Sequence, residues 1–230
     1  MPDVRMTFHM ESERLRSDVV GLATLAEGAI QAGTAALLDG ERAMIQRVVE
    51  GDESLDRLAD ALEERACVLI ARQQPTASDL RALVTVLWVV RELERIGDNM
   101  VNVANAASAP SLQPVDPPVR SLIERMRDQA VAQLRVATDA FVVSDGGAAA
   151  KLEEMDDVMD SLQLDLLQTV VFDAGDKVSV DRAVKLALIS RYFERIADLT
   201  VNIGDRVRFM TRGEFDHYGH HREATPSAPT

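Results

Sequence analysis

Apolar residues recur every three or four positions along most of the chain, the period of a helix packed on one face. The pattern is clearest in two stretches that lie 100 residues apart. The first contains Val86, Val89, Leu93, Ile96, Met100, Val103 and Ala107. The second contains Leu186, Ile189, Phe193, Ile196, Thr200, Ile203 and Val207, where only Thr200 departs from the apolar set. This alternation predicts two long helices, each with one buried seam.

Glycine and proline divide the remaining pattern into further helices. Gly40 and Pro75 interrupt the first half, and Gly146-Gly147 and Gly175 interrupt the second. The predicted helices cover residues 11–38, 41–73, 76–107, 118–144, 148–172 and 178–210. Long helices joined by short turns pack as antiparallel neighbours. The sequence therefore predicts an all-α fold of two tandem three-helix bundles, six long antiparallel helices related by an internal repeat.

Four prolines near the middle of the chain mark the boundary between the halves. They are Pro110, Pro114, Pro117 and Pro118, and each one disfavours helix at its own position or at the residue before it. We predict a first repeat at 1–109, a Pro-rich linker at 110–118, a second repeat at 119–212 and a polar, flexible tail at 213–230.

Composition supports helices and narrows the range of partners. Hydrophobic residues make up 47% of the chain and aromatic residues only 4%, which favours helix over strand. The net charge is 25 − 38 = −13, so binding to nucleic acid is not predicted, and membrane contact is expected only through partners.

The single cysteine, Cys67, is expected to be buried. The N-terminus resembles no secretory signal, and the apolar run at 80–90 is too short to span a bilayer. We expect a soluble, cytoplasmic protein.

The internal repeat keeps polar residues more strictly than apolar ones. An ungapped comparison of residues 53–102 with 153–202 gives twelve identical pairs in fifty, eight of them charged or amide. Apolar residues of similar size interchange at modest cost, so a constraint other than packing acts on the polar groups. The acidic and amide members are Glu53, Asp56, Asp60, Glu94, Asp98 and Asn102, with counterparts Glu153, Asp156, Asp160, Glu194, Asp198 and Asn202.

Helical spacing places these side chains in stripes. Glu94, Asp98 and Asn102 are spaced i, i+4, i+8, and the acids at 53–60 form a second stripe on the preceding helix. Two carboxylates 6 Å apart repel by roughly 2–3 kcal/mol at an effective dielectric constant near 20. Water, arginines or cations must therefore offset the charge. Oxygen ligands suit Mg²⁺, Ca²⁺ or Mn²⁺, carboxylate-bridged iron is also reasonable, and Zn²⁺ is less expected.

A solvated face with local ion pairs is the simpler alternative to a metal site. Arg91 lies three residues before Glu94, and Arg95 lies three before Asp98, so helical salt bridges are expected at both places. Catalysis is not predicted. No histidine occurs between residues 10 and 216, and no Gly-rich phosphate loop is present. Trp88, beside the first seam, is expected to serve packing.

The segments "RELERIGDNMVNVA" and "RYFERIADLTVNIGDRV" resemble the paired E-x-x-x-D-x-x-x-N signatures of the PhoU family of bacterial phosphate-uptake regulators. The resemblance covers residues 10–212 and includes the two-half layout and the acidic second helix of each half. It implies tandem three-helix bundles, with multinuclear iron or zinc clusters at the motif stripes in some members. The motif residues are Glu94, Asp98, Asn102, Glu194, Asp198 and Asn202. The six acids of the preceding helices remain candidates from geometry and the repeat.

The resemblance also implies a role. A PhoU-like protein is expected to be non-enzymatic and to damp phosphate import and phosphate-starvation signalling when phosphate is plentiful. The implied partners are the ATPase of the phosphate ABC transporter and the cognate sensor histidine kinase, and many relatives are homodimers.

Two departures from the family pattern leave alternatives open. Ala197 and Leu199 stand where family members often have Gly and His, and Asn99 replaces that His in the first motif. A metal-free helical adaptor, whose acidic grooves dock a basic partner surface, is the competing hypothesis. A metal-dependent hydrolase is a third.

Overall fold

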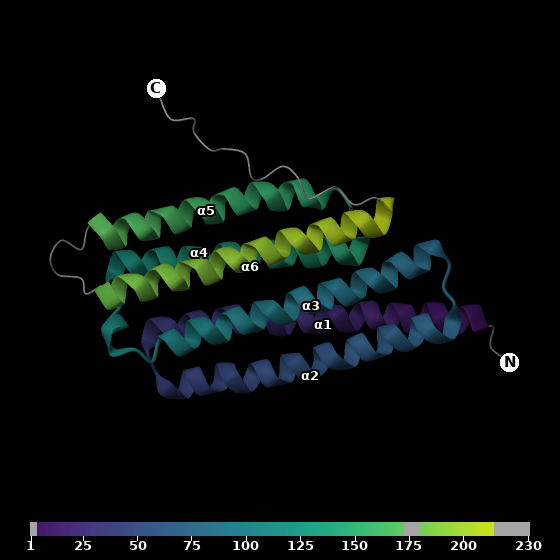
Figure 1. The fold of residues 1–230 in the computed structure, drawn as a ribbon, viewed down its shortest axis with the longest axis horizontal. Helices are drawn as coiled ribbons and strands as arrows, with labels where there is room; N and C mark the ends of the chain where they lie inside the picture. The colour runs from purple at the N-terminus through teal and green to yellow at the C-terminus, as the bar shows by residue number, and fades with distance from the viewer. Residues whose placement is uncertain (1–3, 173–179, 214–230) are drawn as a thin grey trace, which may run out of the picture.

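The computed structural model describes residues 4–172 and 180–213. Six long α-helices follow one another in this part of the chain, with one short 3-10 helix between the halves (Figure 1). They are α1 (Val4–Asp39), α2 (Arg42–Gln73), α3 (Ala77–Ala106), η1 (Pro110–Leu112), α4 (Pro117–Val143), α5 (Ala148–Phe172) and α6 (Val180–Arg212). The all-α fold of two three-helix bundles is confirmed.

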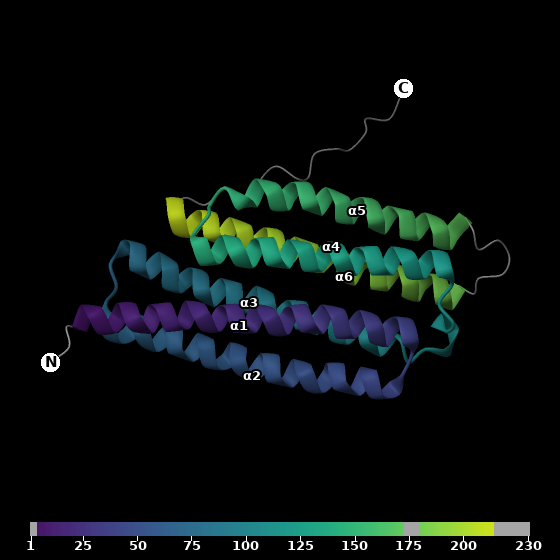
Figure 2. The same ribbon diagram turned by 180° about the vertical axis from the view of Figure 1, so that it is seen from behind.

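The helices lie side by side along one long axis, and both views show the same order across it (Figures 1 and 2). Helix α2 lies at one edge against α1 and α3, and α5 lies at the opposite edge against α4 and α6. The two bundles meet where α3 packs on α6 and α1 packs on α4. The repeated third helices, α3 and α6, are therefore central, and each also borders the acidic helix of its own bundle.

The predicted seams form the core. Every seam residue of α3 and α6 is buried, Thr200 included, and the Thr200 hydroxyl donates to the carbonyl of Ala197 at 2.8 Å. One continuous hydrophobic cluster extends through both bundles. Helices α1 and α3 approach closely at Gly33, where a Cβ would lie 2.6 Å from the Met100 side chain. Because the hydrophobic cluster is continuous, the two repeats share one core.

The helices lie where the sequence predicted them, with small differences at the residues where they begin and end. Helix α1 begins at Val4 rather than at 11, and α4 begins at Pro117 because proline is well tolerated in the first helical turn. The predicted start of α6 at 178 lies outside the described residues, as does almost all of the tail. The segment between the halves is firmly attached, since Arg182 donates to the carbonyls of Ser111 and Pro114 at 2.9 and 3.0 Å.

One sequence expectation changes in the structure. Cys67 is exposed rather than buried, because the buried face of α2 passes through Leu62 and Ala66 and leaves the next residue facing solvent. Among the described residues, one stretch, Met6–Asp39 of α1, is long and apolar enough to cross a membrane by length and composition. This is weak evidence for a span, because Leu15, Leu22 and Ile30 of this helix are fully buried in the bundle core.

Candidate functional site

The first set of predicted acids meets along α2 and α3. The pKa of Asp56 is raised, first by burial and then by repulsion from Glu94, Asp98 and Asp60. These four carboxylates from α2 and α3 therefore lie close enough to repel one another, and we call the surface that they form between the two helices the first groove. Glu53, one turn earlier on α2, is exposed. Glu94 is partly neutralised by Arg91, whose Nη1 lies 2.6 Å from Glu94 Oε2.

Asp52 is a member of this groove that the repeat comparison missed. Its pKa is raised to about 6 by burial and by repulsion from Asp56, Asp98 and Glu94. Its Oδ1 is buried and accepts no hydrogen bond from the described residues. A Cβ on Gly97 would lie 2.5 Å from this oxygen, so the carboxylate occupies space that a larger side chain at position 97 would take. Asp52 lies one residue before the compared range 53–102, and its counterpart is the apolar Leu152, so repetition gave no signal for it.

The second set of acids lines a groove of about 1090 Å³ between α5 and α6. Eight carboxylates and three arginines contribute to it. All six predicted residues of this half are present, namely Glu153, Asp156, Asp160, Glu194, Asp198 and Asn202. The groove also contains Glu154, Asp157 and Asp205, which have no acidic counterparts in the first half.

Burial and crowding perturb the carboxylates of the second groove. The pKa of Asp156 is raised to about 7 by burial and then by repulsion from Asp198, Asp160 and Asp157. Its Oδ1 is buried and has no hydrogen-bond donor of ordinary geometry among the described residues, although the nearby Gln133 amide lowers the pKa slightly. Burial also raises the pKa of Asp198, against the attraction of Arg191 and Arg195. A cation would relieve this strain.

The repeated asparagines have different partners. The Asn102 amide nitrogen donates to the backbone carbonyl of Asp98 at 2.9 Å, and its side chain is exposed. The Asn202 amide instead donates to Glu92 on α3, across the boundary between the bundles. Glu92 is only 9% exposed, and burial raises its pKa despite Arg95 and Arg206 nearby. Asn202 therefore links the second groove to the neighbouring bundle.

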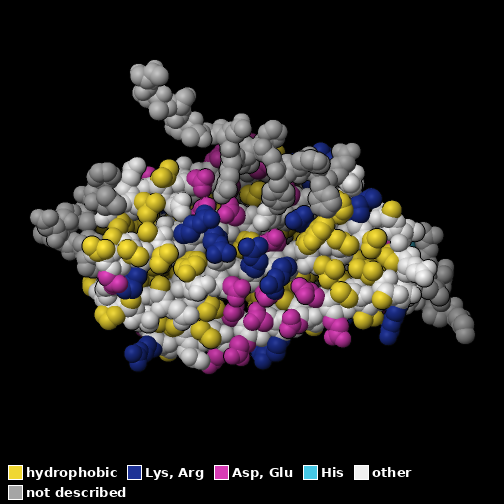
Figure 3. All heavy atoms as spheres, in the orientation of Figure 1, with side chains coloured by type: hydrophobic (Ala, Val, Ile, Leu, Met, Phe, Trp, Pro, Cys, Tyr) yellow, Lys and Arg dark blue, Asp and Glu magenta, His cyan; other side chains and the backbone are white. Residues whose placement is uncertain are grey.

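One of the two ion pairs expected on α3 has a different acid partner. Arg91 pairs with Glu94 as predicted, but Arg95 pairs with Glu92 at 3.1 Å rather than with Asp98. The buried Glu92 lies across the helix from Asp98 and draws the guanidinium toward the second bundle. Arg95 consequently also lines the α5–α6 groove. In Figure 3, basic side chains run along the middle of the α3–α6 face, with acidic side chains on both sides.

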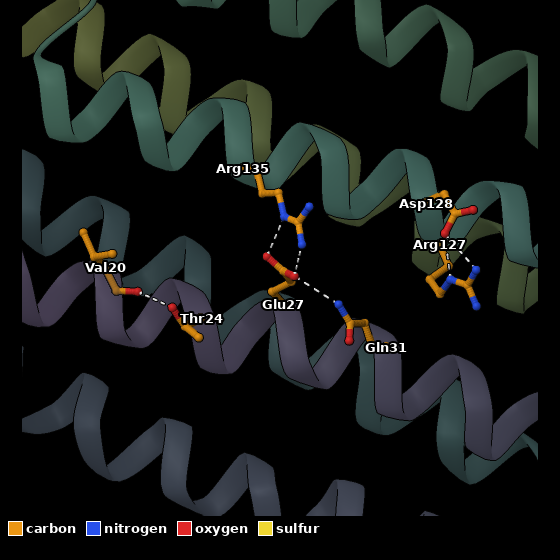
Figure 4. Close-up of polar contacts among 7 residues, drawn as sticks. All are labelled: Val20, Thr24, Glu27, Gln31, Arg127, Asp128 and Arg135. Atoms are coloured by element: carbon orange, nitrogen blue, oxygen red, sulfur yellow. Dashed lines mark hydrogen bonds and ion pairs between the residues drawn. The ribbon is translucent and has the colours of Figure 1, made fainter.

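Contacts on two opposite faces of the molecule hold the two bundles together. The Trp88 ring meets Phe209 edge to face at 5.4 Å, and the Arg206 guanidinium lies 4.3 Å from the Trp88 ring centre. This confirms a packing role for Trp88. On the opposite face, Arg135 of α4 donates to both carboxylate oxygens of Glu27 on α1, at 2.9 and 2.6 Å (Figure 4). These contacts therefore join the two bundles on both faces of the molecule.

The chemistry of the donors fits hard cations, because both sites offer several carboxylate oxygens, and the buried Oδ1 atoms of Asp52 and Asp156 accept no hydrogen bond from the described residues. As the side chains stand in the described ranges, no three His, Cys, Asp or Glu groups gather closely enough to hold a metal ion. Holding a metal would require carboxylates to rotate toward one another.

Comparisons with known proteins agree with the fold and the repeat. A family model described as the PhoU domain matches twice, at residues 19–107 and 123–207. The phosphate-specific transport system accessory protein PhoU homolog 2 of Mycobacterium tuberculosis is 33% identical over 92% of this chain and 100% of its own length.

Solved structures show the same architecture. The crystal structure of PhoU from Pseudomonas aeruginosa superposes with a TM-score of 0.81 at 27% identity, covering 90% of this chain and all of that one. The crystal structure of the phosphate transport system regulatory protein PhoU from Streptococcus pneumoniae also gives 0.81, at 23% identity over 91% and 99% of the two chains. With a family model matched in both halves and relatives that align from end to end, this chain belongs to the PhoU family.

Proposed function

We propose that this protein is a non-enzymatic accessory regulator of phosphate uptake and phosphate-starvation signalling. It damps the phosphate ABC transporter and the cognate sensor kinase when phosphate is plentiful. The observation that carries this proposal is the match of both bundles to the PhoU domain, over a length shared with proteins named as accessories of phosphate-specific transport. Its site of action is the cytoplasm, where it reaches the membrane through its partners and acts as a homodimer.

The two acidic grooves are the proposed cation sites of this regulator. In the first, Glu53, Asp56, Asp60, Glu94, Asp98 and Asn102 would hold the metal, together with Asp52. In the second, the ligands would be Glu153, Asp156, Asp160, Glu194, Asp198 and Asn202. Iron or zinc clusters are proposed, with Mn²⁺, Mg²⁺ or Ca²⁺ as alternatives that suit oxygen donors. Raised pKa values at Asp52 and Asp156 support the proposal, because a bound cation favours the ionised carboxylate.

A metal-free adaptor is the second candidate, and the ion pairs favour it. Arg91 and Arg191 each pair with the motif glutamate three residues later. These contacts already neutralise part of each groove. In such an adaptor the remaining acids would bind a basic surface of the transporter ATPase or of the kinase.

A gene-deletion experiment tests the proposed regulation directly. Deletion should raise expression of a phosphate-starvation reporter, and phosphate import, in phosphate-rich medium. The wild-type gene should restore repression, as should the control Asp128→Asn/Asp139→Asn, which alters two exposed acids of α4. The double variant Asp56→Asn/Asp156→Asn should fail to restore it. Unchanged reporter expression after deletion would contradict the regulatory role.

A further inference from the structure

An apolar patch lies beside the second groove and takes no part in the hydrophobic core. It consists of Leu164 on α5 and Val180, Val184 and Leu188 on α6, and we call it the α5–α6 patch. Their exposed fractions are 57%, 80%, 53% and 52%. Scattered exposed aliphatic residues are ordinary on protein surfaces, but a contiguous group marks an interaction site. Hydrophobic side chains reach the surface over the N-terminal half of α6 (Figure 3).

The α5–α6 patch continues the line of the acidic groove on both helices. Leu164 follows Asp160 by one helical turn, and Leu188 precedes Arg191 by three residues, while both Asp160 and Arg191 line the groove. Because α5 and α6 run antiparallel (Figure 1), these extensions reach the same end of the helix pair. From Val180 to Asp205 the surface spans 25 residues of α6, or about 37 Å at 1.5 Å per residue.

The first bundle has only part of this surface. The counterpart of Leu164 is Glu64, a charged residue. The counterparts of Val180 and Leu188 are Leu80, which is 39% exposed, and Trp88, which packs against Phe209. The counterpart of Val184 is the identical Val84, so the repeat keeps part of the apolar extension, but Glu64 and the packed Trp88 interrupt it in the first bundle.

We propose that the α5–α6 groove and patch together form a docking surface for a basic amphipathic helix of a partner protein. Charge selects the partner, because eight carboxylates face three arginines in the groove. The partner's apolar residues would cover the α5–α6 patch, and its Lys or Arg side chains would enter the acidic groove. An amphipathic helix meets both requirements along one line, since its apolar anchors recur at i, i+3, i+4 and i+7.

This inference deepens the metal-free adaptor offered above as the second candidate function, by adding the α5–α6 patch and the form of the partner. It requires neither a bound metal nor phosphate signalling, so its outcome is separable from the deletion experiment above. Nucleic acid and anionic lipid do not fit the surface, because both are negatively charged like the groove.

Two synthetic helical peptides of about 24 residues test the proposal by fluorescence anisotropy with the full-length protein. One has leucines at helical spacing flanked by lysines, and the other has the same leucines with glutamates in place of lysines. The basic peptide should bind at least about tenfold more tightly than the acidic one. Its affinity should fall as salt is raised, because part of the attraction is electrostatic.

Matched variants locate the binding. Leu188→Glu should weaken the basic peptide about tenfold, whereas Val143→Glu should not, although Val143 is 70% exposed and lies on α4. Asp157→Asn/Asp160→Asn should weaken it severalfold. Glu53→Gln/Asp60→Asn, which makes the same change in net charge on the first bundle, should leave it unaltered. All these positions are exposed, and circular dichroism should confirm an unchanged fold.

Three results would overturn the proposal. The first is equal binding of the acidic peptide. The second is an equal loss of affinity for the basic peptide in Asp157→Asn/Asp160→Asn and in Glu53→Gln/Asp60→Asn, which would indicate attraction by net charge alone. The third is a dimer that Leu188→Glu dissociates at micromolar protein concentration in analytical ultracentrifugation, which would assign the patch to a second copy of this chain.

Discussion

The two acidic grooves carry the same motif but differ in their surroundings. In the first, Gly97 lets the Asp52 carboxylate approach α3, and Asn102 donates only to its own helix. In the second, Ala197 occupies the glycine position, and Asn202 donates to Glu92 of the other bundle. The second groove also gains Arg95 from α3, and it borders the α5–α6 patch.

The difference shows what a repeat does and does not determine. Helical spacing places the repeated acids on α2–α3 and α5–α6, so each pair of helices brings its carboxylates together. The neighbours are set by the antiparallel packing of α3 on α6, which has no counterpart within a single repeat. We therefore expect the two grooves to offer the same kind of ligand atoms. They should differ in how much they contribute to the stability of the fold and in their contacts with the other bundle.

The largest effect should come from removing the space beside Asp52. Gly97→Val places carbon atoms against Asp52 Oδ1 and Leu55, and should lower the free energy of unfolding by about 2 kcal/mol in urea titrations. Gly51→Val on α2 is the control, because a Cβ there meets no atom within 4 Å among the described residues. Equal stability of the two variants would show that the first groove needs no glycine.

The pH dependence of stability should separate the two buried carboxylates. Asp156 has a folded pKa of about 7 against 3.8 when unfolded, so the metal-free folded state holds more protons and loses stability as pH rises from about 4 to 7. Asp156→Asn removes this loss. It should raise the melting temperature by about 4 °C at pH 8, with a gain that shrinks toward pH 4.

Asp52→Asn should give a smaller gain over a narrower range, because the pKa of Asp52 is raised only to about 6. The measurement is differential scanning calorimetry in chelator-treated buffer at several pH values. A melting temperature for Asp156→Asn that stays parallel to wild type at all pH values would contradict the raised pKa.

The smallest effect should distinguish the two asparagines. Asn202→Ala removes a donor from the buried Glu92 and should cost about 1 kcal/mol of unfolding free energy. Asn102→Ala should change stability by less than about 0.5 kcal/mol, because its amide donates only to an exposed backbone carbonyl. Identical losses would mean that the link between the bundles is not specific to the second groove.

Much of the fold could be predicted from the sequence because its signals are local. The three–four alternation identified the seam residues of α3 and α6, and every one is buried. Gly40 has a positive φ of 69° at the break after α1, where glycine is the favoured residue. The extra turns at the start of α1 were missed because residues 4–10 show little apolar periodicity.

The site was only partly predictable, because its candidate residues were chosen as acids and amides that are identical in the two halves. Asp52 and Asp205 lie outside the compared ranges 53–102 and 153–202, and Glu154 and Asp157 were excluded because their counterparts, Ser54 and Arg57, are not acidic. The 100° step from Ala66 to Cys67 placed the thiol outside the core, which composition alone did not reveal. Glu92 was not singled out because its counterpart is Tyr192, and its role depends on α6, which is distant in sequence.

Elemental analysis by mass spectrometry measures whether the two acidic grooves bind cations. Tag-free protein purified without chelator would be compared with Asp56→Asn/Asp98→Asn and with Asp156→Asn/Asp198→Asn. We expect stoichiometric iron, zinc or manganese in the wild type, part of it lost in each folded variant and all of it lost when the four substitutions are combined. Wild-type protein that stays metal-free after reconstitution with these ions would contradict this expectation, and the grooves would then be docking surfaces only.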